Sequence, residues 1–296
     1  MNWILDADIK GFFDHVSHEW LEKFLQHRIA DHRILRLIQK WLKAGVSENG
    51  EWSGTAQGTP QGAVISPLLA NVYLHYVFDL WAEAWRKASA TGDMIIVRYA
   101  DDLVVGFENR TDAERFLKDF QERLAKFELE LHSDKTRLIA FGRKVWRDRK
   151  RDGQPQPEPF TFLGFTHFCG ENTRGYFDVW RKTAAKRMCA KLRQIKLELR
   201  ARMHEPVAVT GAWLKRVVLG YYQYYAVPGN LKALGRFRWR LARLWRRCLL
   251  RRSQRSRVIW EWLGPIFAIW LPAPRTLHPY PNVRFDARIQ GGSRVR

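Results

Sequence analysis

Residues 94–107, Met-Ile-Ile-Val-Arg-Tyr-Ala-Asp-Asp-Leu-Val-Val-Gly-Phe, form the stretch around which the rest of the chain is organised. Two apolar, β-branched runs flank the tetrad Tyr99-Ala100-Asp101-Asp102, and neither has the period of a helix. The pattern predicts two strands, buried on both faces and joined by a tight turn. A surface turn with solvated carboxylates is the plainer alternative, because Asp is common in turns. Buried flanks would instead place the carboxylates at the mouth of a cleft, where a hard cation such as Mg²⁺ compensates their charge.

The composition indicates a cytoplasmic protein with no membrane partner. The 296 residues are enough for one large domain or two ordinary ones. The three cysteines, Cys169, Cys189 and Cys248, lie far apart and form no Cys/His cluster, which argues against a zinc site or a disulfide framework. The N-terminus has no signal-peptide pattern, and no apolar run approaches membrane-spanning length.

The net charge of +21 is concentrated in the last part of the chain. Residues 1–180 contain 24 Lys and Arg against 26 acidic residues, whereas residues 181–296 contain 27 against four, a balance of +23. A solvated basic face is the usual explanation of a charge run, but Trp and Tyr are interleaved with these cations. So large an excess favours a polyanionic partner. Most of these cations are Arg, which pairs with phosphate and stacks on bases, and this favours RNA.

Hydrophobic spacing predicts the elements on either side of the tetrad. Residues 3–9 alternate apolar and acidic side chains, which predicts a strand with Asp6 and Asp8 on one face. Helices are expected at 17–29, 31–45, 68–88, 111–127, 183–204, 211–226, 231–252 and 257–263, and further strands at 129–131, 138–141 and 160–165.

Three local signals refine this assignment. Thr111-Asp112-Ala113-Glu114 predicts a capping box, and Thr183 is the expected N-cap of the helix at 183–204. Residues 143–159 are charged and then Pro-rich, and predict an exposed loop. We therefore expect an α+β domain at 1–180, followed by a helical, RNA-binding domain at 181–296 with a basic tail.

Four segments occur in the order found in reverse transcriptases. They are Asp8-Ile-Lys-Gly-Phe-Phe-Asp14, Gly58-Thr-Pro-Gln-Gly-Ala-Val-Ile-Ser-Pro-Leu-Leu-Ala-Asn71, Tyr99-Ala-Asp-Asp102 and Phe162-Leu-Gly-Phe165. The second resembles the bacterial group II intron reverse transcriptase/maturase family in particular, and residues 220–230 and 251–255 resemble its thumb/maturase region. The resemblance implies a right-hand polymerase palm, an antiparallel sheet with packed helices, followed by an all-α basic thumb/maturase bundle.

The resemblance also implies a catalytic site with two Mg²⁺ ions. Asp8 and Asp101 would hold the ions, with Asp102 beside them, for transfer of a nucleotide to a primer 3′-hydroxyl. Phe13 matches the aromatic residue beneath the incoming sugar, although Phe13 packing in the core is a serious alternative. Asp6 and Asp14 are expected to support the site or the fold.

Further positions match substrate-contacting residues of the family. Gln61 and Gly62 would line the pocket for nucleotide and template. Lys135 matches a lysine near the nucleotide phosphates, with a solvated turn lysine as the alternative. Phe162, Leu163 and Gly164 would support the primer strand.

The basic bundle would hold RNA. The expected RNA-binding residues are Arg238, Arg240, Arg243, Arg246, Arg247, Arg251 and Arg252. Tyr221, Tyr222, Tyr224 and Tyr225 are candidates for stacking on unpaired bases, and we expect at least two of them to fill the helix core instead.

Two functions stay open at this level. Members of the family carry a fingers region before the first palm motif, whereas this chain begins seven residues before Asp8, so we expect a truncated gene, a fragment or half of a split protein. The first function is an RNA-directed DNA polymerase of a group II intron that uses an RNA template, a DNA primer and dNTPs, and assists splicing of its intron RNA. The second is a non-polymerising RNA-binding splicing cofactor, or a decayed intron reading frame.

Overall fold

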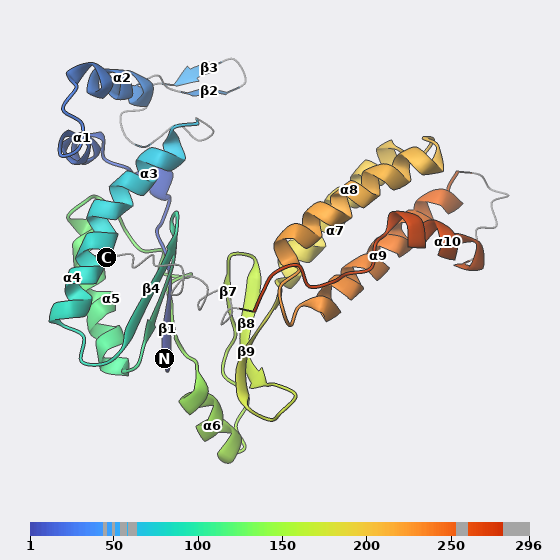
Figure 1. The fold of residues 1–296 in the computed structure, drawn as a ribbon. Coiled ribbons are helices and arrows are strands. Elements are labelled where there is room, and N and C mark those ends of the chain that lie inside the picture. Colours follow the sequence, from blue (N-terminus) through green and yellow to red (C-terminus); the bar gives the residue numbers. More distant parts are fainter. Residues whose placement is uncertain (44–45, 49–50, 54–57, 59–63, 253–259, 281–296) are drawn as a thin grey trace. The chain divides into compact units, whose positions relative to one another are not determined.

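The computed structural model describes residues 1–43, 46–48, 51–53, 58, 64–252 and 260–280 (Figure 1). The chain divides into two compact units. The N-terminal unit comprises residues 1–160 and 169–178, and the C-terminal unit comprises residues 161–168 and 179–296. Each unit has its own cluster of buried apolar side chains. No helix in the described part of the chain is both long enough and apolar enough to cross a lipid bilayer.

The N-terminal unit is built on a four-stranded antiparallel sheet in the order β4-β5-β1-β6. Its strands are β1 (Trp3–Asp8), β4 (Met94–Tyr99), β5 (Asp102–Phe107) and β6 (Arg137–Ala140). The strand predicted at 3–9 and the hairpin predicted at 94–107 are thus confirmed. Because β1 lies beside β5, the first acidic motif of the sequence meets the tetrad.

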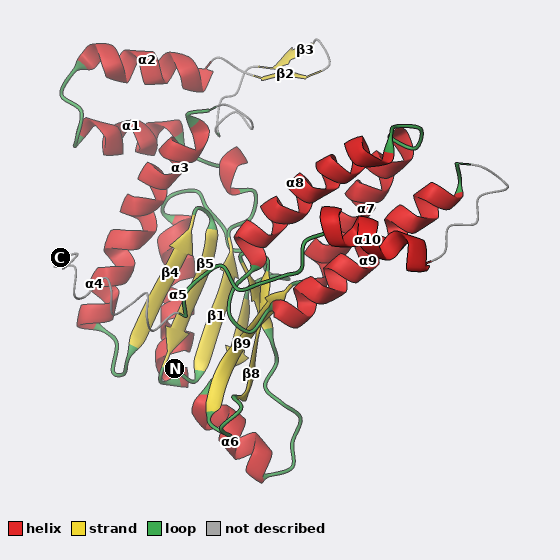
Figure 2. Cartoon of the chain, turned by 45° about the vertical axis from the view of Figure 1, so that its right-hand side comes forward, coloured by secondary structure: helices red, strands yellow, loops and turns green. Residues whose placement is uncertain are grey.

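Helices cover one face of this sheet (Figure 2). They are α3 (Ser66–Leu74), the π-helical segment η2 (His75–Asp79), α4 (Leu80–Ala88) and α5 (Arg110–Ala125). The helix predicted at 68–88 therefore contains a π-helical turn, a feature that is frequent at functional sites. The apolar side chains of the covered face, such as Leu5 and Phe107, are fully buried against Phe78 and Phe116 of the helices.

The N-terminal unit also contains elements outside this sheet and the helices that cover it. They are the 3-10 turn η1 (Phe12–Asp14), α1 (His18–Gln26), α2 (His32–Lys43), the hairpin β2 (Val46–Glu48) with β3 (Glu51–Ser53), and α6 (Arg143–Arg151). A three-stranded sheet follows in the order β7 (Phe160–Phe162), β8 (Phe165–Glu171) and β9 (Phe177–Thr183).

Burial of both hairpin strands on both faces is a prediction that the structure corrects. Strand β5 is buried as expected, but β4 is an edge strand with one open face. Ile95, Val97 and Tyr99 alternate along that open face and are 53%, 44% and 66% exposed. The apolar run therefore predicted the strand correctly, but it did not predict that one face of the strand is exposed.

Four other local predictions are wrong for identifiable reasons. Residues 143–151 form α6 rather than a loop, and the prediction is wrong because seven of these nine residues are charged and none is buried. Thr111 and Glu114 do not form a capping box, since α5 begins at Arg110 with Asn109 as its N-cap, and Glu114 accepts a bond from Arg110 Nε instead. Residues 129–131 form only an isolated bridge between Leu131 and Ile9. Thr183 ends β9, and Ala184 occupies the N-cap of the next helix.

The C-terminal unit is mainly helical. Its helices are α7 (Ala185–Ala201), α8 (Val207–Tyr225), α9 (Leu231–Leu250) and α10 (Trp260–Trp270). The first three are close to the predicted ranges, whereas α10 ends seven residues beyond the range predicted at 257–263. Its core contains Phe237 and Trp245 of α9, both fully buried. Buried Asn230 joins the sheet to the helices, because its side chain accepts a bond from Thr183 N and donates one to Thr183 Oγ1, both at 2.9 Å.

Candidate active site

The candidate site begins with two carboxylates that face each other across β1 and β5. Asp8 is the register partner of Asp102, and directly opposed residues of antiparallel strands project to the same face. Ala7 and Leu103, the next pair, are buried in the core beneath the helices. Asp8 and Asp102 therefore lie on the face of the sheet that the helices do not cover.

Asp101 lies in the two-residue turn between the paired residues Tyr99 and Asp102. Ala100, the other turn residue, has φ of 54°, in the left-handed region that side chains other than glycine rarely adopt. Such a conformation persists only where surrounding contacts hold it, and it is concentrated at functional sites.

Arg98 holds this turn. Its guanidinium forms a two-pronged ion pair with Asp79 of η2, with Nε 2.7 Å from Oδ1 and Nη2 2.6 Å from Oδ2. Nη1 also donates to Asn71 Oδ1 at 2.8 Å and to the Ala100 carbonyl at 3.1 Å. The Arg98 side chain is 14% exposed and that of Asp79 is 32% exposed, so the guanidinium is better shielded from water than its carboxylate partner. The left-handed turn is thereby fixed to the helix behind the sheet.

Hydrophobic spacing does not identify Arg98 as a functional residue, although the sequence contains a signal for it. A charged residue within the apolar run Ile95-Ile96-Val97-Arg98-Tyr99 requires a partner if the strand is buried. That partner, Asp79, lies in a helix whose π-helical turn cannot be read from hydrophobic spacing.

Lys135 reaches the same carboxylates. Its Nζ donates to Asp8 Oδ2 at 2.8 Å. This bond and the charge of Asp8 raise the pKa of Lys135, and the charge of Asp101 raises it further. The structure thus brings together Lys135, Asp8 and Asp101, three residues that the sequence places far apart.

The pKa of the neighbouring Asp6 reflects both its burial and the negative charge of the other carboxylates at this site. Burial raises the pKa of Asp6, while Arg137, 3.6 Å away, opposes the shift. The charges of Asp102 and Asp8 raise it further, so these carboxylates repel one another. A cation bound at this face would relieve that repulsion.

The donor set suits Mg²⁺. Among the described residues there is no group of three or more His, Cys, Asp or Glu side chains arranged to hold a metal ion by themselves. Mg²⁺ is usually held by one or two carboxylates together with water and substrate phosphates, so a complete protein cage is not required. Asp8 and Asp102, with Asp101 beside them in the turn, provide hard oxygen ligands of that kind.

The second motif packs against the first, and its last residue contacts Arg98, which precedes the tetrad. Gly58 has φ of +86°, and a Cβ there would lie 2.8 Å from the carbonyl oxygens of Phe13 and Asp14. Only glycine fits this approach, and Gly58 N donates to Val16 O at 2.9 Å. At the other end of the motif, Asn71 contacts Arg98.

Phe13 is half-buried, with its ring 5.4 Å from that of the buried Phe12. Its ring also lies against the core of the unit. The structure is therefore compatible both with Phe13 beneath the incoming sugar and with Phe13 as a core residue. Gln61 and Gly62, expected in the nucleotide pocket, lie outside the described residues.

The residues expected to contact the primer belong to the C-terminal unit. Leu163 and Gly164 form a turn with φ of 48° and 76° after Phe162. Tyr224 Oη donates to Leu163 O at 2.8 Å, and a Cβ on Gly164 would lie 2.9 Å from Tyr225 Oη. The turn is therefore fixed to α8.

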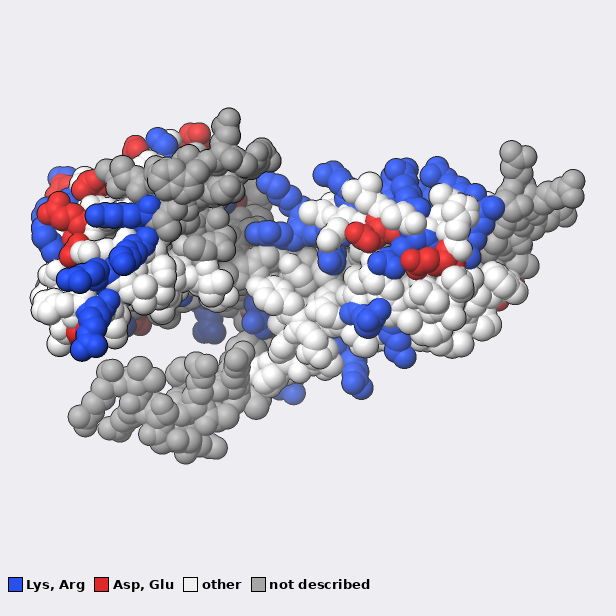
Figure 3. Space-filling model, turned by 90° about the horizontal axis from the view of Figure 1, so that it is seen from above, with Lys and Arg blue, Asp and Glu red and all other residues white. Residues whose placement is uncertain are grey.

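The seven predicted RNA-binding arginines differ in their surroundings. Arg238 donates to Leu271 O at 2.7 Å, and Arg243 and Arg246 lie over the rings of Trp239 and Trp260. Arg240 Nη1 is 4.0 Å from Cys189 Sγ, and two guanidinium nitrogens of Arg252 are buried with no partner in the described part of the chain. Arg247 and Arg251 line a pocket. Figure 3 shows Lys and Arg side chains spread over the C-terminal unit with few acidic ones among them.

The stacking tyrosines divide as expected. Tyr221 and Tyr222 are 7% and 2% exposed, which confirms that at least two of the four fill the core. Tyr224 is 51% exposed, but one face of its ring stacks on Phe165.

Comparison with known proteins decides the family. Residues 1–167 match the family described as reverse transcriptase (RNA-dependent DNA polymerase), which is more than half of the chain. The chain belongs to the reverse transcriptase family. It is 48% identical over 73 residues to the group II intron-encoded protein LtrA of Lactococcus lactis, a match that covers 25% of this chain and 12% of LtrA. The expected relation to group II intron proteins is confirmed.

Two further similarities are more extensive but weaker. Protein YkfC of Escherichia coli is 30% identical over 188 residues, covering 51% of this reverse transcriptase chain and 49% of YkfC. The matches thus span less than half the length of these two curated relatives. The structure of Candida albicans telomerase with a fragment of telomeric RNA aligns with 99% of the chain and 50% of its own, at 11% identity and a TM-score of 0.42. That likeness is too weak to bear on function.

Proposed function

We propose that the N-terminal unit is the palm of an RNA-directed DNA polymerase of the group II intron type, which adds nucleotides to the 3′-hydroxyl of a primer. The observation that carries the proposal is the pairing of Asp8 with Asp102 on the open face of the sheet, with Asp101 in the adjoining turn. The intron RNA would serve as template, with a DNA primer and dNTPs as the other substrates.

Asp8, Asp101 and Asp102 would hold two Mg²⁺ ions. When bound, the ions would activate the primer hydroxyl and stabilise the charge that develops on the α-phosphoryl group. Two further residues, Arg98 and Lys135, would assist this chemistry. Arg98 orients the turn that presents Asp101, because it fixes the Ala100 carbonyl to η2. Lys135, exposed apart from its bond to Asp8, is free to exchange that bond for a nucleotide phosphate.

Phe13 would lie beneath the sugar of the incoming nucleotide and disfavour a 2′-hydroxyl. The C-terminal unit would act as thumb and maturase surface, holding template–primer duplex and intron RNA through its excess of Arg. A second function, a splicing cofactor that binds RNA without polymerising, is favoured by one observation, namely that the basic C-terminal unit has a hydrophobic core of its own.

Primer extension by the Asp101→Asn variant on an RNA template tests the proposal. The substitution removes a metal-binding charge from the turn, so extension should fall to background while RNA affinity stays near that of the wild type. Asp93→Asn, an exposed Asp just before β4 in the same hairpin, is the matched control and should extend normally. Extension by Asp101→Asn at the wild-type rate would exclude the catalytic assignment, and absence of extension in the wild type would leave the splicing cofactor.

A further inference from the structure

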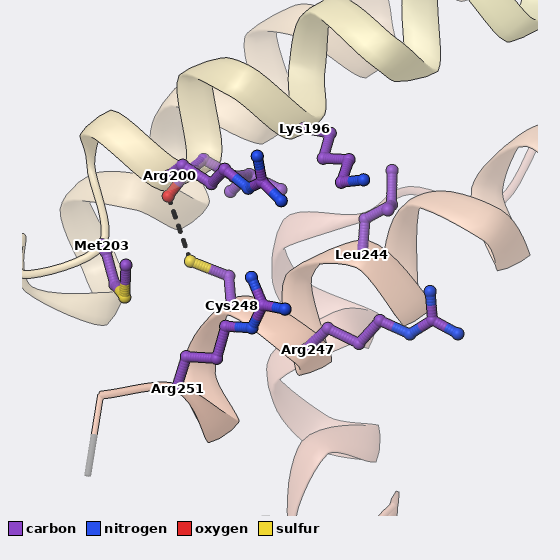
Figure 4. Close-up of a pocket in the computed structure, with 8 residues that line it drawn as sticks. Lys196, Arg200, Met203, Leu244, Arg247, Cys248 and Arg251 are labelled. Carbon is purple, nitrogen blue, oxygen red and sulfur yellow. Dashed lines mark hydrogen bonds between the residues drawn. The ribbon is translucent and has the colours of Figure 1, made fainter.

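A small pocket of about 100 Å³ lies between α7 and α9 of the C-terminal unit. Four cationic and four apolar or thiol side chains line it, namely Lys196, Arg200, Arg247 and Arg251 with Leu199, Met203, Leu244 and Cys248. Figure 4 shows Lys196 and Arg200 reaching from α7 toward α9, and Arg251 reaching back from α9. No carboxylate is among these lining residues.

The two helices contribute to the pocket in the same way. Residues 196, 199, 200 and 203 of α7 and its following turn, and residues 244, 247, 248 and 251 of α9 and its C-cap, each follow the spacing i, i+3, i+4, i+7. This spacing places each set on one face of its helix. The pocket is thus the junction of two matched helix faces, each with two cations at the rim.

The floor of the pocket is apolar and uncharged. Leu199 and Cys248 are 1% and 8% exposed, and Cys248 Sγ donates to the Leu199 carbonyl at 3.0 Å. Burial raises the pKa of Cys248, so the thiol stays protonated and supplies no negative charge to the cations above it.

In the part of the chain that the structure describes, no carboxylate forms an ion pair with any of the four cations. Within the same residues, none of them has a side-chain hydrogen bond either. The nearby acidic residues Glu198 and Glu205 are both paired with Arg202, at 3.7 and 3.0 Å. Lys196 and Arg200 are also like charges at i, i+4, an arrangement that destabilises a helix unless an anion joins it.

The dimensions of the pocket indicate which anion fits. Pockets for small organic ligands occupy roughly 300–1,000 Å³, whereas this one has room for about three water molecules. A phosphate group fits that space, but a nucleoside does not. We propose that the pocket binds a single backbone phosphate of a nucleic acid, with the attached nucleosides outside it. The inference rests on the proposed RNA binding of the C-terminal unit and assigns one contact within it.

The test compares two pairs of substitutions in the full chain, measured as affinity for a short RNA duplex at fixed salt. Arg200→Gln with Arg247→Gln removes two cations of the pocket. Arg187→Gln with Arg236→Gln removes two exposed cations of the same helices that do not line it. The first pair should weaken binding by about tenfold or more, and the second by less than about threefold, because only the first breaks charge-assisted hydrogen bonds.

A second variant fills the pocket without a change of charge. Leu244→Phe places a larger side chain in the cavity, and it should weaken RNA binding about as much as the pocket pair. Its melting temperature, compared with that of the wild type, reports whether the fold is retained.

The possible results separate the two proposals. Equal losses from both pairs of substitutions would overturn the phosphate pocket and leave RNA binding by the unit intact. A wild-type chain that binds no RNA would overturn the proposed function itself. In a third outcome, inorganic phosphate raises the melting temperature of the wild type but not that of the Arg200→Gln/Arg247→Gln variant, while both bind RNA equally well. In that case the pocket binds free anions and the nucleic-acid assignment is wrong.

Discussion

The two units treat charge in opposite ways. At the candidate active site of the N-terminal unit, two cations are held in ion pairs, Arg98 with Asp79 and Lys135 with Asp8. Residues 181–296 have only four acidic residues for 27 cations, and two of the four are used by Arg202. Paired charges fix geometry, whereas unpaired cations attract a polyanion. The comparison therefore assigns chemistry to one unit and nucleic-acid affinity to the other, and substitutions should separate them.

The largest effect is expected at Arg98. Arg98→Leu takes the guanidinium away from the partly exposed Asp79 carboxylate, which keeps its contact with His75 at 3.5 Å. It also releases the Ala100 turn, so we expect a loss of about 2 kcal/mol in stability and about a hundredfold in extension rate. Chemical denaturation and single-turnover extension measure the two. The double variant Arg98→Leu/Asp79→Leu has no orphan charge, so stability should recover while extension stays low. Recovery of extension together with stability would reduce Arg98 to a purely structural residue.

A smaller effect is expected at Lys135. If this lysine exchanges Asp8 for a nucleotide phosphate, Lys135→Gln should raise KM for dNTP by about tenfold and leave RNA affinity unchanged. Steady-state extension across a dNTP series measures the change, with Lys118→Gln on the exposed side of α5 as the control. An unchanged KM would return Lys135 to the role of a solvated turn lysine.

The smallest expected effect concerns pH and the C-terminal unit. Burial, with the charge of Arg181, lowers the pKa of His167 from 6.5 to about 4. The folded chain keeps His167 neutral where the unfolded chain binds a proton, so this contribution to stability is complete above about pH 6.5 and falls as the pH drops toward 4. His167→Gln should show a smaller fall in urea midpoint between these pH values than the wild type. The exposed His204→Gln is the control, and identical pH profiles for wild type and His167→Gln would contradict the assignment.

Much of the fold follows from local sequence, but the site requires pairing. Apolar alternation identified β1, and the flanks of the tetrad identified the β4–β5 hairpin. Hydrophobic spacing alone does not specify that Asp8 lies opposite Asp102, because strand register depends on contacts distant in sequence. The matching motifs supplied the expectation that Asp8 and Asp101 come together with Asp102 beside them, but not the pairing of Asp8 with Asp102.

The missed features have two physical causes. Helix α6 has only two apolar residues, Val145 and Trp146, and no buried one, so its charged sequence resembles that of a loop. The role of Arg98 depends on Asp79, which a π-helical turn presents, and the pocket depends on the packing of α7 against α9. The last two features depend on contacts between two elements, whereas hydrophobic spacing predicts only the individual elements.

The most direct test of the division between the units measures extension and RNA affinity together across a salt series. Asp101→Asn and Arg247→Gln are compared with the wild type in the full chain, and extension is measured at saturating RNA. Asp101→Asn should abolish extension and keep the wild-type dependence of affinity on salt. Arg247→Gln should keep extension and flatten the log–log salt slope by about one unit. Loss of affinity in Asp101→Asn equal to that in Arg247→Gln, or loss of extension at saturating RNA in Arg247→Gln, would contradict the separation of chemistry from nucleic-acid binding.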